Sequence, residues 1–311
     1  MISQQLAEDL VGAFDALFGG NPEVRAAHAK GTCCRATFTA TPEAAALTRA
    51  PHMQGSPVRA TVRFSNGSGN LEAHDSGREP RGMAVKFHLD ERKSTDIVSI
   101  NQPVFIVKTP EEVLEFMRLR RPDPETGKIN LEALGAFVAA RPGAERAAQI
   151  LLTSPPLASF LQVDYFAIHA FRFVAADGTA RFGRYRWEPM LGTASLDPAE
   201  ARARNADYLR EDLLARLAEG PASFTLHIQL AEDGDDPTDP TVELPADRPT
   251  VSAGTLEIEG PVDEPESGCE HLVFDPTRLC DGIEESGDLI LSARPRAYSV
   301  SVTRRHRARK V

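Results

Sequence analysis

The segment Arg294-Pro295-Arg296-Ala297-Tyr298 places an arginine and a tyrosine four positions apart near the end of the chain. On a helix, this spacing puts both side chains on one face, one turn from each other. Because proline is tolerated in a first turn and not in an interior, we expect the helix to begin at Pro295. A guanidinium group against a phenol favours the phenolate, which is a strong ligand for ferric iron. Alternatively, the arginine only covers a half-buried tyrosine on a terminal helix.

The composition excludes several classes of protein. The chain has 311 residues, of which 41% are hydrophobic and 26% charged, as in an ordinary globular protein. Its formal net charge of −10 argues against a nucleic-acid partner, and the basic end, residues 304–310, is interpreted as a solvated helix terminus. No apolar run is long enough to span a bilayer, so we expect no membrane partner.

The start of the chain and its cysteines predict a cytoplasmic protein. Residues 1–5 lack the basic and apolar regions of a signal peptide. The four cysteines are Cys33, Cys34, Cys269 and Cys280. They form no C-x-x-C pair, and the adjacent Cys33 and Cys34 would make a poor structural disulfide. We therefore expect free thiols in a reducing compartment, with Cys33 and Cys34 either packed in the core or redox-active.

Hydrophobic periodicity predicts runs of strands with helices between them. Residues 3–18 are expected to form an amphipathic helix that begins at Ser3 and ends at Gly19-Gly20. Strands are expected over residues 34–41, 58–65, 83–89, 103–108, 161–174, 181–187, 223–230 and 251–258, and helices within 110–156 and over 198–220. Strands in runs favour an α+β fold, an antiparallel barrel with helical additions.

Further segments carry side chains suited to acid–base chemistry and anion binding. They are residues 25–31 (RAAHAKG), 62–65 (VRFS), 78–87 (REPRGMAVKF), 96–105 (DIVSINQPVF) and 274–277 (FDPT). His28, in the first of them, is a candidate acid–base group because imidazole titrates near neutral pH. A structural histidine is the alternative.

In this order, the segments resemble those of the haem catalase superfamily. Residues 25–31 are similar to its distal motif R-x-x-H-A-K-G, and residues 62–65 and 78–87 to its motifs V-R-F-S and R-D-P-R-G-F-A-V-K-F. Residues 274–277 and 294–298 are similar to its motifs F-D-P-T and R-x-x-x-Y. The resemblance extends from about residue 20 to about residue 305, and the short chain is similar to the minimal, catalase-related peroxidases.

The resemblance implies the organisation of the chain and the cofactor. It implies a single haem-barrel domain over residues 1–311, with an N-terminal helix (1–20), a proximal helix (290–311) and no C-terminal flavodoxin-like domain. It further implies haem b (iron protoporphyrin IX), with iron held by Tyr298 and the ligand kept anionic by Arg294.

The resemblance also implies roles for residues around the haem. His28 would move a proton between the two oxygens of peroxide, and Ser65 would fix its tautomer or, alternatively, cap a turn. Arg25 and Arg63 match positions that reach haem propionates. The apolar haem contacts would be Phe105 and Phe274, for which core packing is an equally good explanation.

Two departures from the catalase pattern bear on activity. Counting back from Pro103, the functional asparagine of catalases falls on Ile100, and Asn101 aligns with its neighbour. Asn101 serves as the distal amide only if the turn differs. Val113 replaces the aromatic that stacks near the haem. Both changes would weaken the placement of a second peroxide and favour peroxidase turnover.

The sequence therefore predicts a haem-dependent peroxidase that reduces hydrogen peroxide or organic hydroperoxides with a small organic electron donor. Weak residual catalase activity and a part in the oxidative stress response are expected. The alternatives are a fatty-acid hydroperoxide isomerase, like the catalase-like allene oxide synthases, and a haem- or ligand-binding barrel without turnover. We expect a homodimer, because the long arms that join catalase tetramers are missing.

Overall fold

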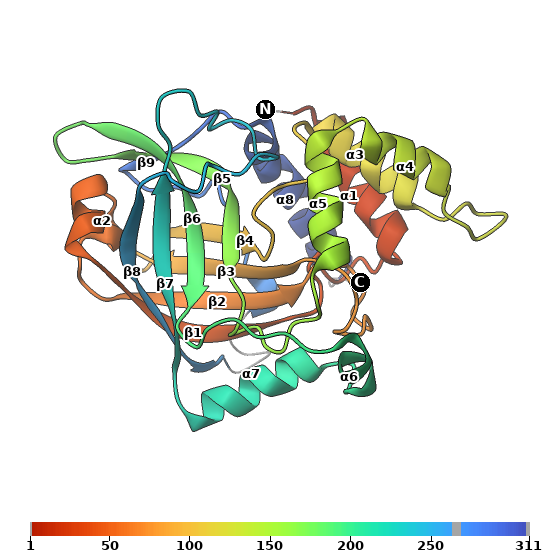
Figure 1. Cartoon of the computed structure of the whole chain (residues 1–311), viewed down its shortest axis with the longest axis horizontal. Helices are drawn as coiled ribbons and strands as arrows, with labels where there is room; N and C mark the ends of the chain where they lie inside the picture. The colour runs from red at the N-terminus through yellow and green to blue at the C-terminus, as the bar shows by residue number, and fades with distance from the viewer. Residues whose placement is uncertain (1, 263–268, 309–311) are drawn as a thin grey trace.

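A closed antiparallel barrel forms the centre of the protein, in a computed structural model that describes residues 2–262 and 269–308. Its strands are β1 (Gly31–Ala40), β2 (Val58–Asn66), β3 (Arg81–His88), β4 (Ser94–Ile100), β5 (Tyr165–Val174), β6 (Ala180–Pro189), β7 (Ala222–Leu230), β8 (Thr250–Pro261) and β9 (Ile283–Glu285). They follow the order β4-β3-β2-β1-β8-β7-β6-β5-β9. Ile100 of β4 pairs with Phe166 of β5, so the first eight strands in this order close on themselves (Figure 1).

Large side chains fill the inside of the barrel. Phe38, Phe87 and Trp187 are 0% exposed, and the Phe38 ring lies edge-on to the other two. On β3, Phe87 points into this core, so Gly82 and other residues in the alternate positions face outward. Because the interior is packed, a site for a large ligand lies on the outer surface of the barrel.

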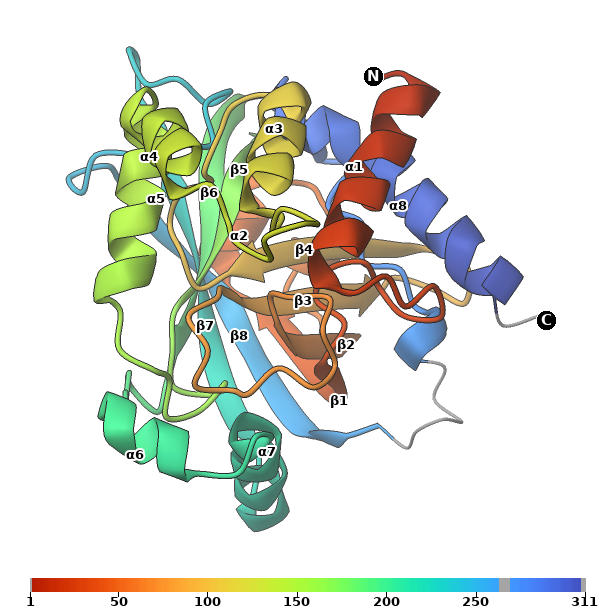
Figure 2. The same cartoon turned by 90° about the vertical axis from the view of Figure 1, so that its right-hand side faces the viewer.

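Helices cover part of this outer surface. They are α1 (Gln4–Phe18), α2 (Pro42–Leu47), α3 (Pro110–Arg120), α4 (Leu131–Ala139), α5 (Pro142–Thr153), α6 (Pro198–Ala203), α7 (Tyr208–Glu219) and α8 (Leu289–Ala308), with short 3-10 turns η1 (Pro51–Met53) and η2 (Cys269–His271). α1, α3 and α8 pack against one another beside β3 and β4 (Figure 2). Leu10, Val113 and Ile290 join them in an apolar core of their own. Among the described helices, none combines the length and the apolar character needed to cross a membrane.

The predicted α+β barrel with helical additions is confirmed, as is the N-terminal helix. Ser3 Oγ accepts a hydrogen bond from the Leu6 amide at 3.1 Å, and Gly19 ends α1 in the left-handed region with φ +94°. The strand expected over residues 103–108 is wrong. Residues 103–108 form a loop that contains Pro103, and the strand is β4, whose register with β3 was not visible in the sequence.

The expected helix over residues 198–220 is divided in two. α6 ends before Arg204, and α7 begins at Tyr208. Between them, the Asn205 side chain accepts a hydrogen bond from the Asp207 amide at 3.0 Å. This local bond competes with helical hydrogen bonding and breaks the helix.

The proximal helix begins earlier than predicted. α8 starts at Leu289, and Pro295 lies inside it. Asp288 Oδ1 accepts hydrogen bonds from the amides of Ile290 (2.7 Å) and Leu291 (3.2 Å), which fixes the first turn. This cap and the burial of Ile290 and Leu291 offset the hydrogen bond that Pro295 cannot donate. Residues 309–311, the end of the predicted basic helix, lie outside the described residues.

The expectation of free thiols is wrong for two of the four cysteines. Cys33 on β1 and Cys269 in η2 form a disulfide, with Cα atoms 6.2 Å apart. Cys34 and Cys280 are free. The sequence argument tested only neighbouring cysteines, whereas this bond joins positions 236 residues apart that the fold brings together.

Candidate active site

His28 lies in the loop between α1 and β1, against the outward face of β2 and β3. Its Nδ1 is 3.0 Å from Ser65 Oγ, so the structure brings together two of the predicted catalytic residues. A Cβ atom on Gly82 would lie 2.8 Å from both of these atoms, so the imidazole fits here only because residue 82 has no side chain. His28 has φ +55°, a conformation that costs energy and that the surroundings must hold.

Electrostatics keep the His28 ring neutral. Its pKa is lowered to about 3, first by burial and then by nearby guanidinium charges. In decreasing order, those charges belong to Arg63, Arg294, Arg25 and Arg81. At neutral pH the ring is therefore uncharged and able to accept a proton. One of these charges, Arg294, comes from α8, which is far from His28 in the sequence.

A hydrogen-bonded chain runs from a buried carboxylate to the Tyr298 phenol. Arg294 Nη2 donates to Tyr298 Oη, as the spacing of the two residues predicts, and Arg294 Nη1 lies 3.1 Å from His169 Nε2. His169 Nδ1 lies 2.6 Å from Asp288 Oδ2. Because arginine only donates, His169 Nε2 must accept, so the proton is on Nδ1 and is donated to Asp288. This hydrogen-bonded chain holds the permanently charged Arg294 guanidinium against the Tyr298 phenol oxygen.

Sequence reasoning missed His169 and Asp288. Both are buried, at 1% and 0% exposure, and burial lowers the pKa of His169, which stays neutral. His169 interrupts an apolar strand, which was the available signal. Asp288 is the cap of α8, and it was overlooked because the helix was expected to begin at Pro295.

Replacing Asp288 with alanine is expected to destabilise the protein by about 2–4 kcal/mol, because α8 loses its cap and the buried His169 Nδ1–H loses its acceptor. The measurement is the free energy of unfolding in denaturant. Asp197→Ala is the matched control, since Asp197 caps α6 through the amides of Ala199 and Glu200 and has no histidine partner. If Asp288→Ala lowered the free energy of unfolding no more than the control does, the proposed hydrogen bond from His169 to Asp288 would be contradicted.

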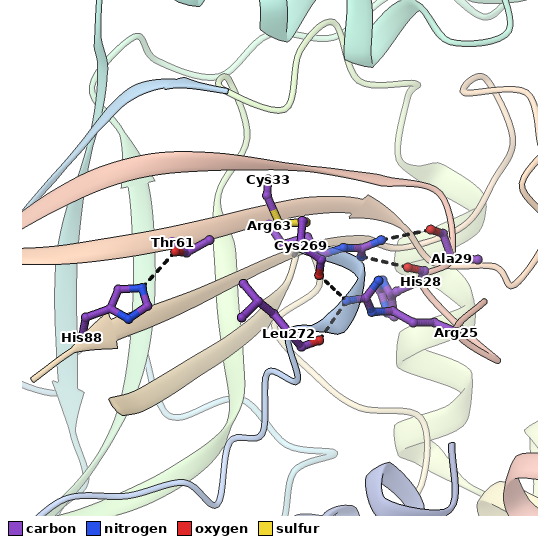
Figure 3. The surroundings of a disulfide bond; sticks show 9 residues. All are labelled: Arg25, His28, Ala29, Cys33, Thr61, Arg63, His88, Cys269 and Leu272. Atoms are coloured by element: carbon purple, nitrogen blue, oxygen red, sulfur yellow. Dashed lines mark hydrogen bonds between the residues drawn. A yellow bond between two sulfur atoms is a disulfide. The ribbon is translucent and has the colours of Figure 1, made fainter. Parts of the chain in front are cut away.

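Two further predicted residues, Arg25 and Arg63, hold the backbone around the site. Arg25 Nη2 donates to the carbonyl oxygens of Cys269 (3.1 Å) and Leu272 (3.0 Å), as Figure 3 shows. Arg63 donates to the carbonyl oxygens of residues 28–29 at 2.8 and 2.9 Å. Their contact with haem propionates stays a prediction.

Three other predicted residues lie in packed surroundings. Asn101 Oδ1 accepts a hydrogen bond from the Arg81 amide at 2.7 Å and extends the pairing of β3 with β4. Phe105 packs on the apolar core of the helices. Phe274 belongs to a small cluster around the disulfide, with Lys86 Nζ 5.2 Å from its ring centre. Their roles at the haem stay predictions.

The donor set fits a haem. The Tyr298 phenol oxygen with its arginine suits ferric iron, and the neutral His28 suits proton transfer to and from a peroxide. Two of the guanidinium charges that act on His28, those of Arg25 and Arg63, suit the two carboxylates of a porphyrin. Gly82 leaves the wall of β3 without a side chain at His28.

Comparison with known proteins gives the family. The model of the family Catalase matches residues 21–310. A "Catalase-related peroxidase" of Mycolicibacterium paratuberculosis is 40% identical over 285 residues, which cover 91% of this chain and 90% of the relative. A protein of the same name from Synechococcus elongatus is 34% identical over 300 residues, covering 96% and 88%.

Solved catalases share the fold. A crystal structure of a fungal catalase aligns with a TM-score of 0.83 and 25% identity, covering 91% of this chain and 59% of the catalase. A bacterial catalase aligns with a TM-score of 0.82 and 25% identity, covering 92% and 58%. The chain thus spans about six-tenths of the length of these solved catalases. It belongs to the catalase family, whose members bind haem.

Proposed function

We propose that the chain is a peroxidase that uses haem b to reduce hydrogen peroxide or organic hydroperoxides with a small organic electron donor, and that it keeps weak catalase activity. The hydrogen-bonded chain from Asp288 to Tyr298, together with a neutral His28 on which the Arg294 charge acts, is the observation that carries the proposal. The names of the two catalase-related peroxidases support the choice of reaction.

On the distal side, His28 moves the proton. With Nδ1–H donated to Ser65 Oγ, Nε2 carries the lone pair that takes a proton from one peroxide oxygen. The low pKa of His28, about 3, makes its protonated form a strong acid that returns the proton to the other oxygen as the O–O bond breaks. A bound haem would supply the redox-active iron that links the electron donor to the peroxide.

Tyr298 would hold the haem iron. The Arg294 charge favours its anionic form, and His169 and Asp288 fix the position of Arg294. An anionic oxygen ligand stabilises ferric and higher oxidation states of iron, which suits peroxide reduction. Arg25 and Arg63 would bind the propionates, and Phe105 and Phe274 would contact the porphyrin edge.

The distal amide supports peroxidase turnover over dismutation. Asn101 Oδ1 accepts a hydrogen bond from the Arg81 amide, which ties this side chain to the end of the β3–β4 pairing and limits how it can orient toward a peroxide. Dismutation needs a second peroxide held as reductant, and a peroxidase needs only electrons delivered by a donor. Asn101 remains our candidate for the distal amide, in this reduced role.

Oxygen evolution and dye oxidation, measured on one haem-loaded sample with hydrogen peroxide, test the reaction. We expect dye oxidation to be faster than oxygen evolution. Oxygen evolution without dye oxidation would indicate a catalase, and neither activity would indicate a binding barrel. With a fatty-acid hydroperoxide, an alcohol product supports the proposal, and an epoxide would indicate the isomerase.

Replacing Gly82 with alanine is expected to slow the reaction with peroxide by roughly tenfold to a hundredfold, because the new Cβ displaces the His28 ring. Stopped-flow absorption measures the rate. Gly135→Ala, in α4 where a Cβ meets nothing within 4 Å, is the control and keeps the parent rate. Equal rates in the two variants would contradict the assignment of His28.

The setting of the enzyme is proposed as well. We place it in the cytoplasm, as a single-domain homodimer that acts in the oxidative stress response. Light scattering of the haem-loaded protein tests the dimer, and mass spectrometry of the extracted pigment tests haem b. Disulfides such as Cys33–Cys269 are rare in a reducing compartment such as the cytoplasm, where thiols are usually kept reduced.

A further inference from the structure

The disulfide lies in the wall of the candidate site. Cys33 and Cys269 are each 1% exposed and form a small apolar cluster with Phe274. One sulfur comes from β1, which is part of the rigid barrel, and the other from η2, which lies outside it. The bond therefore fastens a turn to the barrel.

Arg25 forms hydrogen bonds with this turn. The carbonyl oxygens of Cys269 and Leu272 accept hydrogen bonds from Arg25 Nη2, at 3.1 and 3.0 Å. The Leu272 amide in turn donates to the Cys269 carbonyl at 3.2 Å, so the two acceptors belong to one turn. Arg25 is thus held by a structure that the disulfide keeps in place (Figure 3).

The other cysteine, Cys33, lies beside Arg63, which is hydrogen-bonded to the same loop. Cys33 is directly opposite Arg63 in the register of β1 with β2. Arg63 donates to the carbonyl oxygens of residues 28–29. The loop from Arg25 to His28 is therefore held at one end through the turn and at the other by the barrel. These contacts act together with the His28 amide, which donates to the Gly67 carbonyl oxygen at 3.1 Å, on a loop in which His28 has φ +55°.

We infer that Cys33 and Cys269 form a redox-controlled positioning site for Arg25 and, through it, for the His28 loop. With the bond closed, the turn presents both carbonyl oxygens to Arg25. With the bond open, only noncovalent contacts hold the turn, and the Arg25 end of the loop gains mobility. Cys33 and Cys269 are positioning residues, since they act through Arg25.

The redox chemistry uses ordinary partners. A dithiol reductant opens the bond by thiol–disulfide exchange: two electrons and two protons pass to Cys33 and Cys269, and the reductant becomes a disulfide. A peroxide closes it again. One thiol attacks the peroxide and becomes a sulfenic acid, releasing an alcohol or water; the second thiol displaces water and forms the S–S bond. The proposed substrate is thus also the oxidant.

The first experiment establishes the bond. The protein is purified without reductant, treated with hydrogen peroxide, unfolded in the presence of an alkylating agent and digested. We expect alkylated Cys34 and Cys280 and a cross-linked peptide pair containing Cys33 and Cys269. Alkylation of all four cysteines would overturn the inference.

The second experiment tests positioning by amide hydrogen exchange of the full chain, before and after reduction with a phosphine. We expect exchange in residues 25–29 to rise by about tenfold or more when the parent is reduced. The Cys33→Ser/Cys269→Ser variant, which cannot form the bond, should exchange as fast as the reduced parent, with or without the phosphine. Cys280→Ser is the control and behaves like the parent. Arg25→Ala should exchange fast in both redox states. Unchanged exchange in the reduced parent would overturn the inference.

A haem-transfer measurement connects the site with the cofactor, and this arm rests on the proposed function. Haem loss to an acceptor protein should be faster after reduction in the parent and insensitive to reduction in Arg25→Ala. Faster hydrogen exchange without faster haem loss would leave the positioning of the loop standing and count against the propionate role of Arg25. A parent that binds no haem would refute the proposed function alone.

Discussion

The Tyr298→Phe variant is expected to lose most of its haem affinity and all absorption bands of an iron–phenolate bond. Removing a group that only orients a metal ligand typically costs about 10–100-fold in affinity, so removing the ligand itself should cost more than about a hundredfold. The fold should persist, because Tyr298 is only partly buried on α8. Haem titration followed by absorption, with circular dichroism for the fold, measures both quantities.

The control for this variant is Tyr208→Phe. The Tyr208 hydroxyl donates to the Leu157 carbonyl oxygen at 2.9 Å, away from α8. Its loss should cost about 1 kcal/mol of stability and leave haem binding unchanged. Normal iron–phenolate bands in Tyr298→Phe would mean that another residue holds the iron.

The second large effect is expected from His28→Ala. Haem should remain bound, and the rate constant for the reaction with peroxide should fall by about a hundredfold or more, which is the usual contribution of a positioned acid–base group. Stopped-flow absorption after mixing with hydrogen peroxide measures the rate. A parent rate in the variant would exclude His28 from proton transfer.

The pH dependence of the parent enzyme follows from the same residue. Because the pKa of His28 is lowered to about 3, its proton-accepting form dominates above that value, and the rate constant should be level from mildly acidic to neutral pH. The loss of activity should come only as the pH falls toward 3. A transition centred near the ordinary pKa of histidine would show that burial and the surrounding arginines do not act on this ring.

The sequence predicted what local spacing and ordered motifs determine. The strand runs indicated an antiparallel barrel, and the four-residue spacing brought Arg294 to the Tyr298 phenol oxygen. The order of the motifs indicated the catalase family. These features depend on neighbours along the chain, so they can be identified without coordinates.

What the sequence could not give depends on contacts between distant segments. His169 comes from β5 and meets Asp288 and Arg294 because β9, which pairs with β5, leads directly into α8. The Cys33–Cys269 bond joins residues 236 positions apart, and the sequence around either cysteine does not indicate the pairing. The rule on proline gave the wrong start of α8, since a side-chain cap and burial outweighed a local preference.

A crystal structure of the haem-loaded protein tests the central claim most directly. The account predicts that Tyr298 Oη is bonded to the iron on one face of the porphyrin, with Arg294 still donating to that oxygen, and that the His28 ring lies over the opposite face. An iron held by any other residue, or His28 on the same face as Tyr298, would contradict it.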